Sequence, residues 1–190
     1  MLEKNWMKNI FSSWRNLILI FCPWLFFSTK KIFFGENIFH DFFEKNSNKK
    51  HAKIQNVHSQ NEIFLQVIGA PDPYQRQLNG MGGGISSLSK IVIISPPSKD
   101  NADVDYTFGQ VSVDKPIVDY NTNCGNLSSA VGPFAIDEGL VQLNTNEGTN
   151  TIRLHNTNTG VIIHAHVPVI NGEAAITGDY QIQGVHGTGA

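Results

Sequence analysis

The sequence predicts an α+β domain in which mainly antiparallel strands surround one central helix. Short apolar runs that suit buried strands, such as KIVIIS at 90–95, alternate with segments whose apolar residues follow the helical period. Asn- and Gly-rich stretches separate the later apolar runs, and such stretches favour tight hairpin turns. Hairpins join antiparallel neighbours, so most strand pairs are expected to be antiparallel.

The first predicted helix lies in NEIFLQVIGAPDP, from Asn61 onward. Its apolar residues between 63 and 68 have the i, i+4 spacing of one helix face. Gly69 follows as a C-terminal cap, and Pro71 prevents continuation. A glycine- and serine-rich loop, LNGMGGGISSLSK at 78–90, separates this helix from the strand at 90–95.

The second predicted helix is NLSSAVGPFAIDEGLV at 126–141. Leu127, Val131 and Ala135, with Ile136, lie on one side of it, and Gly139 lies near its end. The remaining strands are expected to alternate apolar and polar residues, with turns at 156–160 and 169–173 between the last three. These strands are 103–114, 151–156, 160–169 and 178–185.

Residues 1–60 differ in composition from residues 61–190 and are interpreted as a separate, aberrant segment, an apolar stretch followed by a polar linker. They contain all three tryptophans, many lysines and the apolar stretch NLILIFCPWLFF at 16–27. This stretch is too short to cross a bilayer as a helix, which takes about 20 residues. Basic residues precede it as in a secretory signal, but no small-residue cleavage site follows. Three interpretations stay open: a signal or anchor, a buried strand, and a tail without stable structure.

Charge and cysteine content exclude several classes of protein. The net charge of −2 provides no basic stripe for phosphates, so no nucleic-acid partner is expected. The two cysteines, Cys22 and Cys124, have different surroundings and form no disulfide framework. A reducing, cytoplasmic compartment is therefore predicted, and a membrane partner is not expected.

The stretch NTNCGN at 121–126 places Cys124 where a helix is expected to begin. Asn126 is a good helix N-cap and Gly125 a tolerated one. The first turn of a helix has N–H groups without intrahelical acceptors, and with the helix dipole these attract carboxylates. A helix start also favours the thiolate form of a cysteine. The alternative is that Cys124 is a small buried apolar residue, as most free cysteines are.

The stretch GGGISSLSK at 82–90 combines three glycines with serines and Lys90. Glycines permit a close approach of the backbone, and Ser86 and Ser87 supply hydroxyl donors. A lysine beside buried strand residues can act as a base. The spacing from glycine to lysine does not match a nucleotide-binding loop. The alternative is a flexible linker with a solvated lysine.

Three histidines on neighbouring predicted strands raise the question of a metal site. His164 and His166 share one face of their strand, and His155 lies on the preceding strand. Zinc binds such side chains, but no fourth ligand is evident nearby. Surface histidines on a sheet are the more common arrangement, so no metal is predicted.

Three stretches of the sequence resemble the PrpF family, the 2-methylaconitate cis–trans isomerases. They are VIGAPDPYQRQLNGMGGGISSLSKIVIIS, DVDYTFGQVSVDKPIVDYNTNCGNLSSAVGPFAIDEGLV and the closing GVHGTGA. The resemblance runs from about residue 64 to residue 190. It implies half of a diaminopimelate-epimerase-like fold, in which two similar α/β halves, each a curled sheet around a helix, enclose the active site.

The resemblance also implies an activity without a cofactor, the isomerisation of a small unsaturated tri- or dicarboxylate by proton transfer. Lys90 would be the principal proton-transfer residue, and Cys124 would lie in the site as a second acid–base group or as part of its wall. Carboxylate contacts are then expected from Ser86, Ser87, Asn123, Gly125 and Asn126.

The sequence departs from the family pattern at both ends. Family members usually begin with M-R-G-G-T-S-K-G followed by V-F-F, whereas FFSTKKIFF at 26–34 lacks the arginine and both early glycines. The chain also stops where family members enter their second half. These departures predict a truncated copy, whose partner would be the missing half or a second copy of itself. A non-catalytic remnant or binding partner is the alternative function.

Overall fold

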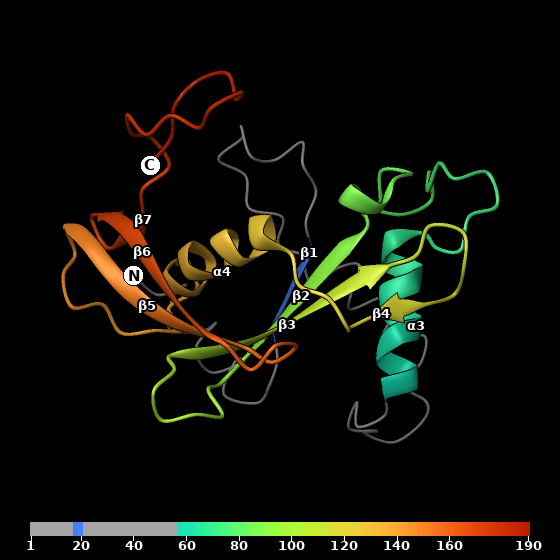
Figure 1. Ribbon diagram of the computed structural model, residues 1–190, viewed down its shortest axis with the longest axis horizontal. Helices are drawn as coiled ribbons and strands as arrows, with labels where there is room; N and C mark the ends of the chain where they lie inside the picture. Colours follow the sequence, from blue (N-terminus) through green and yellow to red (C-terminus); the bar gives the residue numbers. More distant parts are fainter. Residues whose placement is uncertain (1–16, 21–56) are drawn as a thin grey trace, which may run out of the picture. The chain divides into compact units, whose positions relative to one another are not determined.

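The structure, a computed structural model, describes residues 17–20 and 57–190. Cys22 and the stretch at 26–34 lie outside the described residues. The fold is α+β, as predicted. Within the described residues the elements follow in this order (Figure 1): β1 (Leu17–Ile20), α3 (Val57–Ile68), the 3₁₀ turn η2 (Ser86–Leu88), β2 (Lys90–Ser95), β3 (Val104–Val111), β4 (Val118–Asp119), α4 (Gly125–Asp137), β5 (Gly148–Asn156), β6 (Ile162–Ile170) and β7 (Glu173–Ala174).

The chain divides into two compact units. The first unit contains Val92–Phe108 and Tyr120–Ala190, and the second contains Gly109–Asp119 and the described residues 57–91. This division falls within two strands: it separates Ile91 from Val92 in β2 and Phe108 from Gly109 in β3. Each unit is described by itself below.

The strands follow the order β1-β2-β3-β5-β6-β7, and β4 pairs with β3. The pairs β3–β4, β5–β6 and β6–β7 are antiparallel, which agrees with the prediction. The pair β3–β5 is parallel, with Val104 opposite Leu154. This parallel pair was not predicted. It is formed because α4 lies between the two strands in the chain and supplies the long crossover that parallel neighbours need.

Helix α4 packs against β5, β6 and β7 in the first unit (Figure 1). Its predicted apolar side, Leu127, Val131, Ala135 and Ile136, is buried, which confirms the periodicity. Burial of each larger side chain contributes about 1.5–3 kcal/mol. Gly132 allows the close approach, because a Cβ atom there would lie 3.0 Å from Val167 Cγ2.

The predicted helix end at 141 is wrong: α4 ends at Asp137, and the stop is formed by Gly139. Its φ of +64° is a left-handed conformation that glycine adopts without a steric penalty. The Gly139 N–H donates to the Ile136 carbonyl, and the Leu140 N–H donates to the Ala135 carbonyl. This pair of hydrogen bonds is a Schellman motif, which satisfies the last carbonyls of the helix.

Helix α3 belongs to the second unit and begins at Val57, four residues before the predicted start. It ends at Ile68, and the left-handed Gly69 follows as predicted. Phe64 and Ile68 are buried. The predicted helix is therefore confirmed, but its first turn was assigned to the polar linker because those residues lack apolar periodicity.

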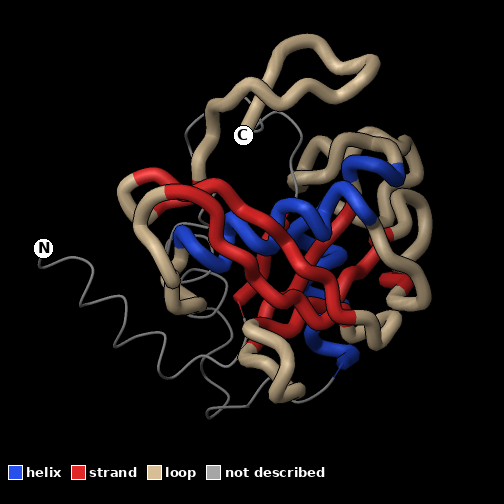
Figure 2. The backbone as a smooth tube through the Cα atoms, turned by 60° about the vertical axis from the view of Figure 1, so that its left-hand side comes forward, coloured by secondary structure: helices blue, strands red, loops and turns tan. Residues whose placement is uncertain are grey.

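The C-terminal strands confirm one prediction and correct another. Asn171 and Gly172, both with positive φ, form the two-residue turn between β6 and β7. The stretch 178–185 is not a strand: it makes only an isolated bridge from Tyr180 to Gly189. Its apolar side chains, Tyr180 and Ile182, are exposed, so no neighbouring strand buries them. Figure 2 shows the chain after β7 as loop up to the C-terminus.

Part of the apolar N-terminal stretch is a strand. Residues Leu17–Ile20 form β1, next to β2 in the sheet order, which favours the strand interpretation over a helical anchor for these four residues. In the part of the chain that the structure describes, no helix combines the length and the apolar character needed to cross a membrane.

Candidate functional site

The stretch Asn123–Asn126 forms the start of α4 in the first unit. The N-cap is Cys124, in an extended conformation and without a side-chain capping bond. The expectation that Asn126 or Gly125 caps the helix is therefore wrong, because both residues already lie inside the helix, whose first residue is Gly125. Asn123, Gly125 and Asn126 are exposed, and Cys124 is half-buried and forms no disulfide among the described residues. Gly125 and Asn126 thus lie at an exposed helix start, and the N–H groups of the first turn have no acceptor within the helix.

A buried hydrogen-bond network fixes this helix start. The Ser128 hydroxyl lies 2.7 Å from the Tyr106 hydroxyl on β3 and donates to the Cys124 carbonyl at 3.0 Å. The Asn156 amide at the end of β5 donates to the same Tyr106 hydroxyl at 2.7 Å. All three side chains are buried. The position of Cys124 is therefore set by two strands as well as by its own helix.

A second contact holds the segment that leads into the helix. Asn158 donates through Nδ2 to the carbonyls of Phe108 and Tyr120, at 2.8 and 2.7 Å, and its Oδ1 accepts the Phe108 N–H. Burial raises the pKa of Tyr120 to about 12, so its phenol stays protonated at neutral pH. The stretch 120–124 therefore begins at an uncharged tyrosine, and the Asn158 amide links the carbonyl of this tyrosine to that of Phe108 on β3.

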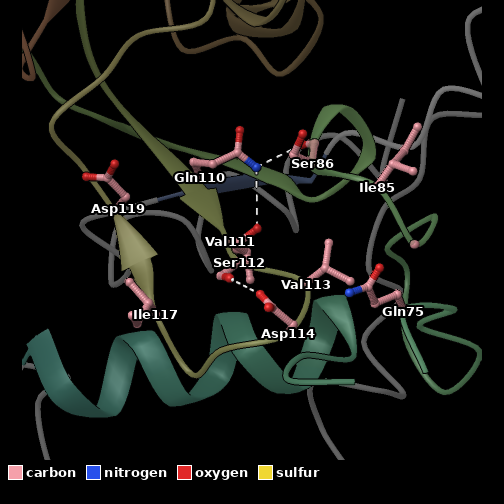
Figure 3. A pocket seen from close by; sticks show the side chains of 11 residues that line it. Gln75, Ile85, Ser86, Gln110, Val111, Ser112, Val113, Asp114, Ile117 and Asp119 are labelled. Atoms are coloured by element: carbon pink, nitrogen blue, oxygen red, sulfur yellow. Dashed lines mark hydrogen bonds between the residues drawn. The ribbon is translucent and has the colours of Figure 1, made fainter. Parts of the chain in front are cut away.

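The glycine–serine loop lies in the second unit. Ser86 and Ser87 begin the short turn η2 and are exposed, while Lys90 is the first residue of β2 and is half-buried. The Gln110 amide donates to the carbonyls of Ser86 and Ser89 at 2.8 and 2.9 Å, and Figure 3 shows the contact with Ser86. The same side chain on β3 thus contacts the first residue of η2 and the residue just before Lys90.

A pocket of about 530 Å³ opens beside this loop, between Gly84–Ser86, the end of β3 and β4 (Figure 3). Ser86 is the predicted site residue that lines it. Two carboxyl groups, those of Asp114 and Asp119, also line it, and Asp114 accepts a hydrogen bond from the Ser112 hydroxyl at 3.0 Å. The described residues that line it contain no lysine or arginine.

A second hollow in the same unit, of about 870 Å³, lies along residues 69–79. Its turn is organised by Asp72. The backbone N–H groups of Tyr74, Gln77 and Arg76 donate to the Asp72 carboxylate and hold its pKa below the usual value. These hydrogen bonds fix the backbone at Gln77, the residue that directly precedes the glycine–serine loop in the chain.

The predicted site residues fall into two groups, one in each unit. Lys90, Ser86 and Ser87 lie together in the second unit, whereas Asn123–Asn126 lie together at the start of α4 in the first. Each group is contiguous in sequence, which is why local patterns could locate it.

The histidines do not form a common site. His155 is buried, and its Nδ1 lies 2.9 Å from Asp105 Oδ1. His164 and His166 are exposed on β6, where His166 Nδ1 lies 2.9 Å from the Thr151 hydroxyl. Among the described residues no group of three histidine, cysteine or acidic side chains is placed to hold a metal ion.

Sequence reasoning missed the residues that hold the two groups in place. They are Tyr106, Ser128, Asn156, Asn158, Gln77 and Gln110. The one local signal was the Asn-rich stretch at 156–160, which was interpreted only as a turn. The others are single polar residues inside strands, a helix or a loop, where no spacing distinguishes them.

Comparison with known proteins gives matches over most of the described chain. The family described as PrpF protein matches residues 41–190. A 2-methyl-aconitate isomerase of Shewanella oneidensis is 53% identical over 125 residues, 65% of this chain and 32% of that protein. A 3-methylitaconate isomerase of Eubacterium barkeri is 47% identical over 129 residues, 68% of this chain and 33% of that protein. A 4-oxalomesaconate tautomerase of Pseudomonas putida is 46% identical over 129 residues, 67% of this chain and 34% of that protein.

A solved structure agrees with these matches. The crystal structure of a methylitaconate-delta-isomerase superposes with a TM-score of 0.67 at 45% identity, covering 72% of this chain and 34% of that one. The chain thus spans about a third of the length of the curated relatives it matches.

Proposed function

Because the chain belongs to the PrpF family, we propose that it acts in the isomerisation of small unsaturated carboxylates by proton transfer. The names of its relatives support this class of substrate: methylaconitate, methylitaconate and oxalomesaconate each combine carboxylates with a carbon–carbon double bond. A proton on a carbon beside such a double bond is acidic, since the negative charge left behind spreads toward a carboxylate.

The proposed reaction needs a proton carrier and fixed donors for the developing charge, and it includes no oxidation or reduction. Lys90 is the proposed carrier. It removes the proton from one carbon and returns a proton to another carbon, or to the same carbon after the bond has rotated. Donors that are already in place stabilise the charge without reorganising during the reaction.

The start of α4 is the proposed site for a substrate carboxylate. The observation on which this proposal depends most is that the exposed stretch Asn123–Asn126 is held by the buried Tyr106–Ser128–Asn156 network. The N–H groups of Gly125 and Asn126, aided by the helix dipole, would bind the anion. Cys124 would be a second acid–base group or part of the wall. In the second unit, Ser86 and Ser87 would bind a carboxylate through their hydroxyls.

A second candidate function is the binding of a small ligand without catalysis. The carboxyl group of Asp114 in the wall of the pocket beside Ser86 favours it, because this group would repel a multiply charged anion placed against it. In the enzymatic proposal the uncharged part of the substrate would face this wall instead.

Deuterium uptake from heavy water into a methylaconitate or methylitaconate, followed by NMR, tests the proposal. The purified chain is expected to exchange the hydrogen beside the double bond, and Lys90→Ala is expected to slow this exchange by about 10²–10⁴-fold. Lys99→Ala is the matched control: Lys99 donates to the Gly160 carbonyl at an exposed position, so exchange should stay unchanged. Cys124→Ala separates an acid–base role, which predicts a similar loss, from a role in the wall.

Exchange at the rate of the buffer alone would overturn the enzymatic proposal, as would exchange that survives Lys90→Ala. If such a chain still binds the carboxylate, measured by the ligand's NMR line width, the binding function is the better account.

A further inference from the structure

A buried side chain, that of Gln77, holds the glycine–serine loop by hydrogen bonds and belongs to neither group of predicted site residues. Gln77 is only 1% exposed. Its Oε1 accepts the Gly84 N–H at 2.8 Å and the Ser89 hydroxyl at 2.8 Å. The Ser89 proton has a second acceptor, the Ile85 carbonyl, at 2.9 Å. One amide oxygen therefore joins the beginning of the loop to the residue directly before Lys90.

Two glycines of the loop leave the space that this contact needs. A Cβ atom on Gly82 would lie 2.2 Å from Gln77 Oε1, which real structures do not allow. Gly84 has a φ of +75°, and its Cβ would lie 2.3 Å from the Gln75 carbonyl oxygen. The run of glycines is thus shaped around the turn that contains Gln77.

Stability alone does not account for an amide at this position. Gln77 has a left-handed backbone, with φ of +49°, which costs a residue with a side chain roughly 1–2 kcal/mol. Its buried Nε2 has no hydrogen-bond acceptor among the described residues. A buried donor without an acceptor costs about 1–3 kcal/mol. A glycine or asparagine would suit the backbone better, and an apolar side chain would remove the unsatisfied donor.

The backbone at Gln77 is also held from the other side. Its N–H donates to the Asp72 carboxylate at 2.6 Å, together with the N–H groups of Tyr74 and Arg76. The amide oxygen is therefore presented to the loop by a turn that is itself fixed.

We propose that Gln77 is a positioning residue, whose side-chain oxygen sets the conformation of loop 82–89 and thereby places Ser86, Ser87 and the adjoining Lys90. Its effect on the reaction rests on the proposed function, whereas its effect on the loop does not. Gln77 itself does not touch the reacting atoms in this proposal.

Amide exchange measured residue by residue by NMR on the full chain tests the effect on the loop. Gln77→Met has a similar length and no comparable acceptor, so the Gly84 amide is expected to exchange at least about tenfold faster. Gln77→Glu keeps an acceptor oxygen and should retain the Gly84 protection. The melting temperature of Gln77→Met should change little, since the unsatisfied donor is removed together with the acceptor.

A glycine variant tests the same contact without altering Gln77. Gly82→Ala places a methyl group on the Gln77 amide and should expose the Gly84 amide to the same extent. Gly189→Ala is the control, because its Cβ meets no atom within 4 Å. Should Gln77→Met fail to fold, Gly82→Ala still decides the question.

Turnover supplies the second measurement. Gln77→Met is expected to lower kcat/KM for deuterium exchange about tenfold, and Gln77→Glu to restore it to within about threefold. Unchanged Gly84 exchange in Gln77→Met or Gly82→Ala would overturn the positioning role, as would equal loss of protection in Gln77→Glu and Gln77→Met. An inactive wild-type chain would instead refute the proposed function, while the amide measurement would still test the loop.

Discussion

The Ser128 hydroxyl shows how one buried side chain connects a helix start to the sheet beneath it. It contacts the Tyr106 hydroxyl, which also accepts a hydrogen bond from Asn156. Because the three groups are buried, water cannot replace a group that is removed, and the remaining groups lose a hydrogen-bond partner. Ser129, the next residue, is exposed and donates only to the Asn126 carbonyl. The two neighbouring serines therefore have different roles.

Replacing these two serines should separate the buried network from the helix itself. Ser128→Ala is expected to lower the free energy of unfolding by about 1–2 kcal/mol, since the Tyr106 hydroxyl loses a buried partner. Ser129→Ala should change it by less than about 0.5 kcal/mol. Urea unfolding of both variants checks this, and equal losses would contradict it.

At the scale of elements, a local signal at Gly139 ends α4 earlier than the sequence pattern predicted. Gly139 ends the helix in a left-handed conformation, and the hydrogen bonds from Gly139 and Leu140 close its last turn. The β6–β7 hairpin is equally local, since Asn171 and Gly172 both adopt the positive φ that its turn requires. In contrast, the stretch at 178–185 has a strand pattern, but among the described residues it pairs only through the isolated bridge from Tyr180 to Gly189, so it forms no strand.

The helix stop predicts the effect of one methyl group. Gly139→Ala should lower the free energy of unfolding by about 1 kcal/mol, because the added Cβ disfavours the left-handed backbone. The surroundings offer no clash, since a Cβ there meets no atom within 4 Å. Thermal unfolding beside Gly189→Ala, whose Cβ also meets no atom within 4 Å, measures the difference. A loss equal to that of the control would show that the backbone conformation is not responsible.

At the scale of the whole molecule, two carboxyl groups that contact residues 50 positions away in the sequence make the stability depend on pH. Asp103 pairs with Arg153, and Asp105 lies 2.9 Å from His155, across the parallel strands β3 and β5. The hydrogen bond from the Arg153 side chain lowers the pKa of Asp103 below its usual 3.8. Burial by itself would raise the pKa of Asp105, but hydrogen bonds from Ser98 and His155 together lower it.

These lowered pKa values predict a loss of stability in acid. A carboxyl group with a lower pKa in the folded state stabilises the fold at pH values above its unfolded pKa, and this stabilisation disappears as the pH falls through the folded value. The free energy of unfolding should therefore be level with respect to these groups near neutral pH and fall below about pH 4.

Urea unfolding at several pH values checks this dependence, with Asp103→Asn as the comparison. The variant should be less stable than wild type at pH 7 by up to about 1 kcal/mol, because the pair is partly exposed. The difference should shrink toward pH 2. A constant difference between pH 7 and pH 2 would show that the carboxylate charge is not involved.

Much of the fold follows from local patterns in the sequence. The helix faces of α3 and α4, the bounds of β2, the stop at Gly69, and the hairpin turn at Asn171–Gly172 all depend on neighbours within about one helical turn. The two candidate groups could be proposed for the same reason, because NTNCGN and GGGISSLSK are continuous stretches.

Tertiary structure alone decided how these groups are held and which strands pair. Tyr106 lies 22 residues from Ser128 and 50 from Asn156, and Gln77 lies 12 residues from Ser89. The parallel pairing of β3 with β5 likewise joins residues 50 apart in sequence. A buried hydroxyl or amide needs a partner, but many residues could supply one. Only the packed backbone selects among them, so single polar residues such as Gln77 and Asn156 show no sign of their role in the sequence.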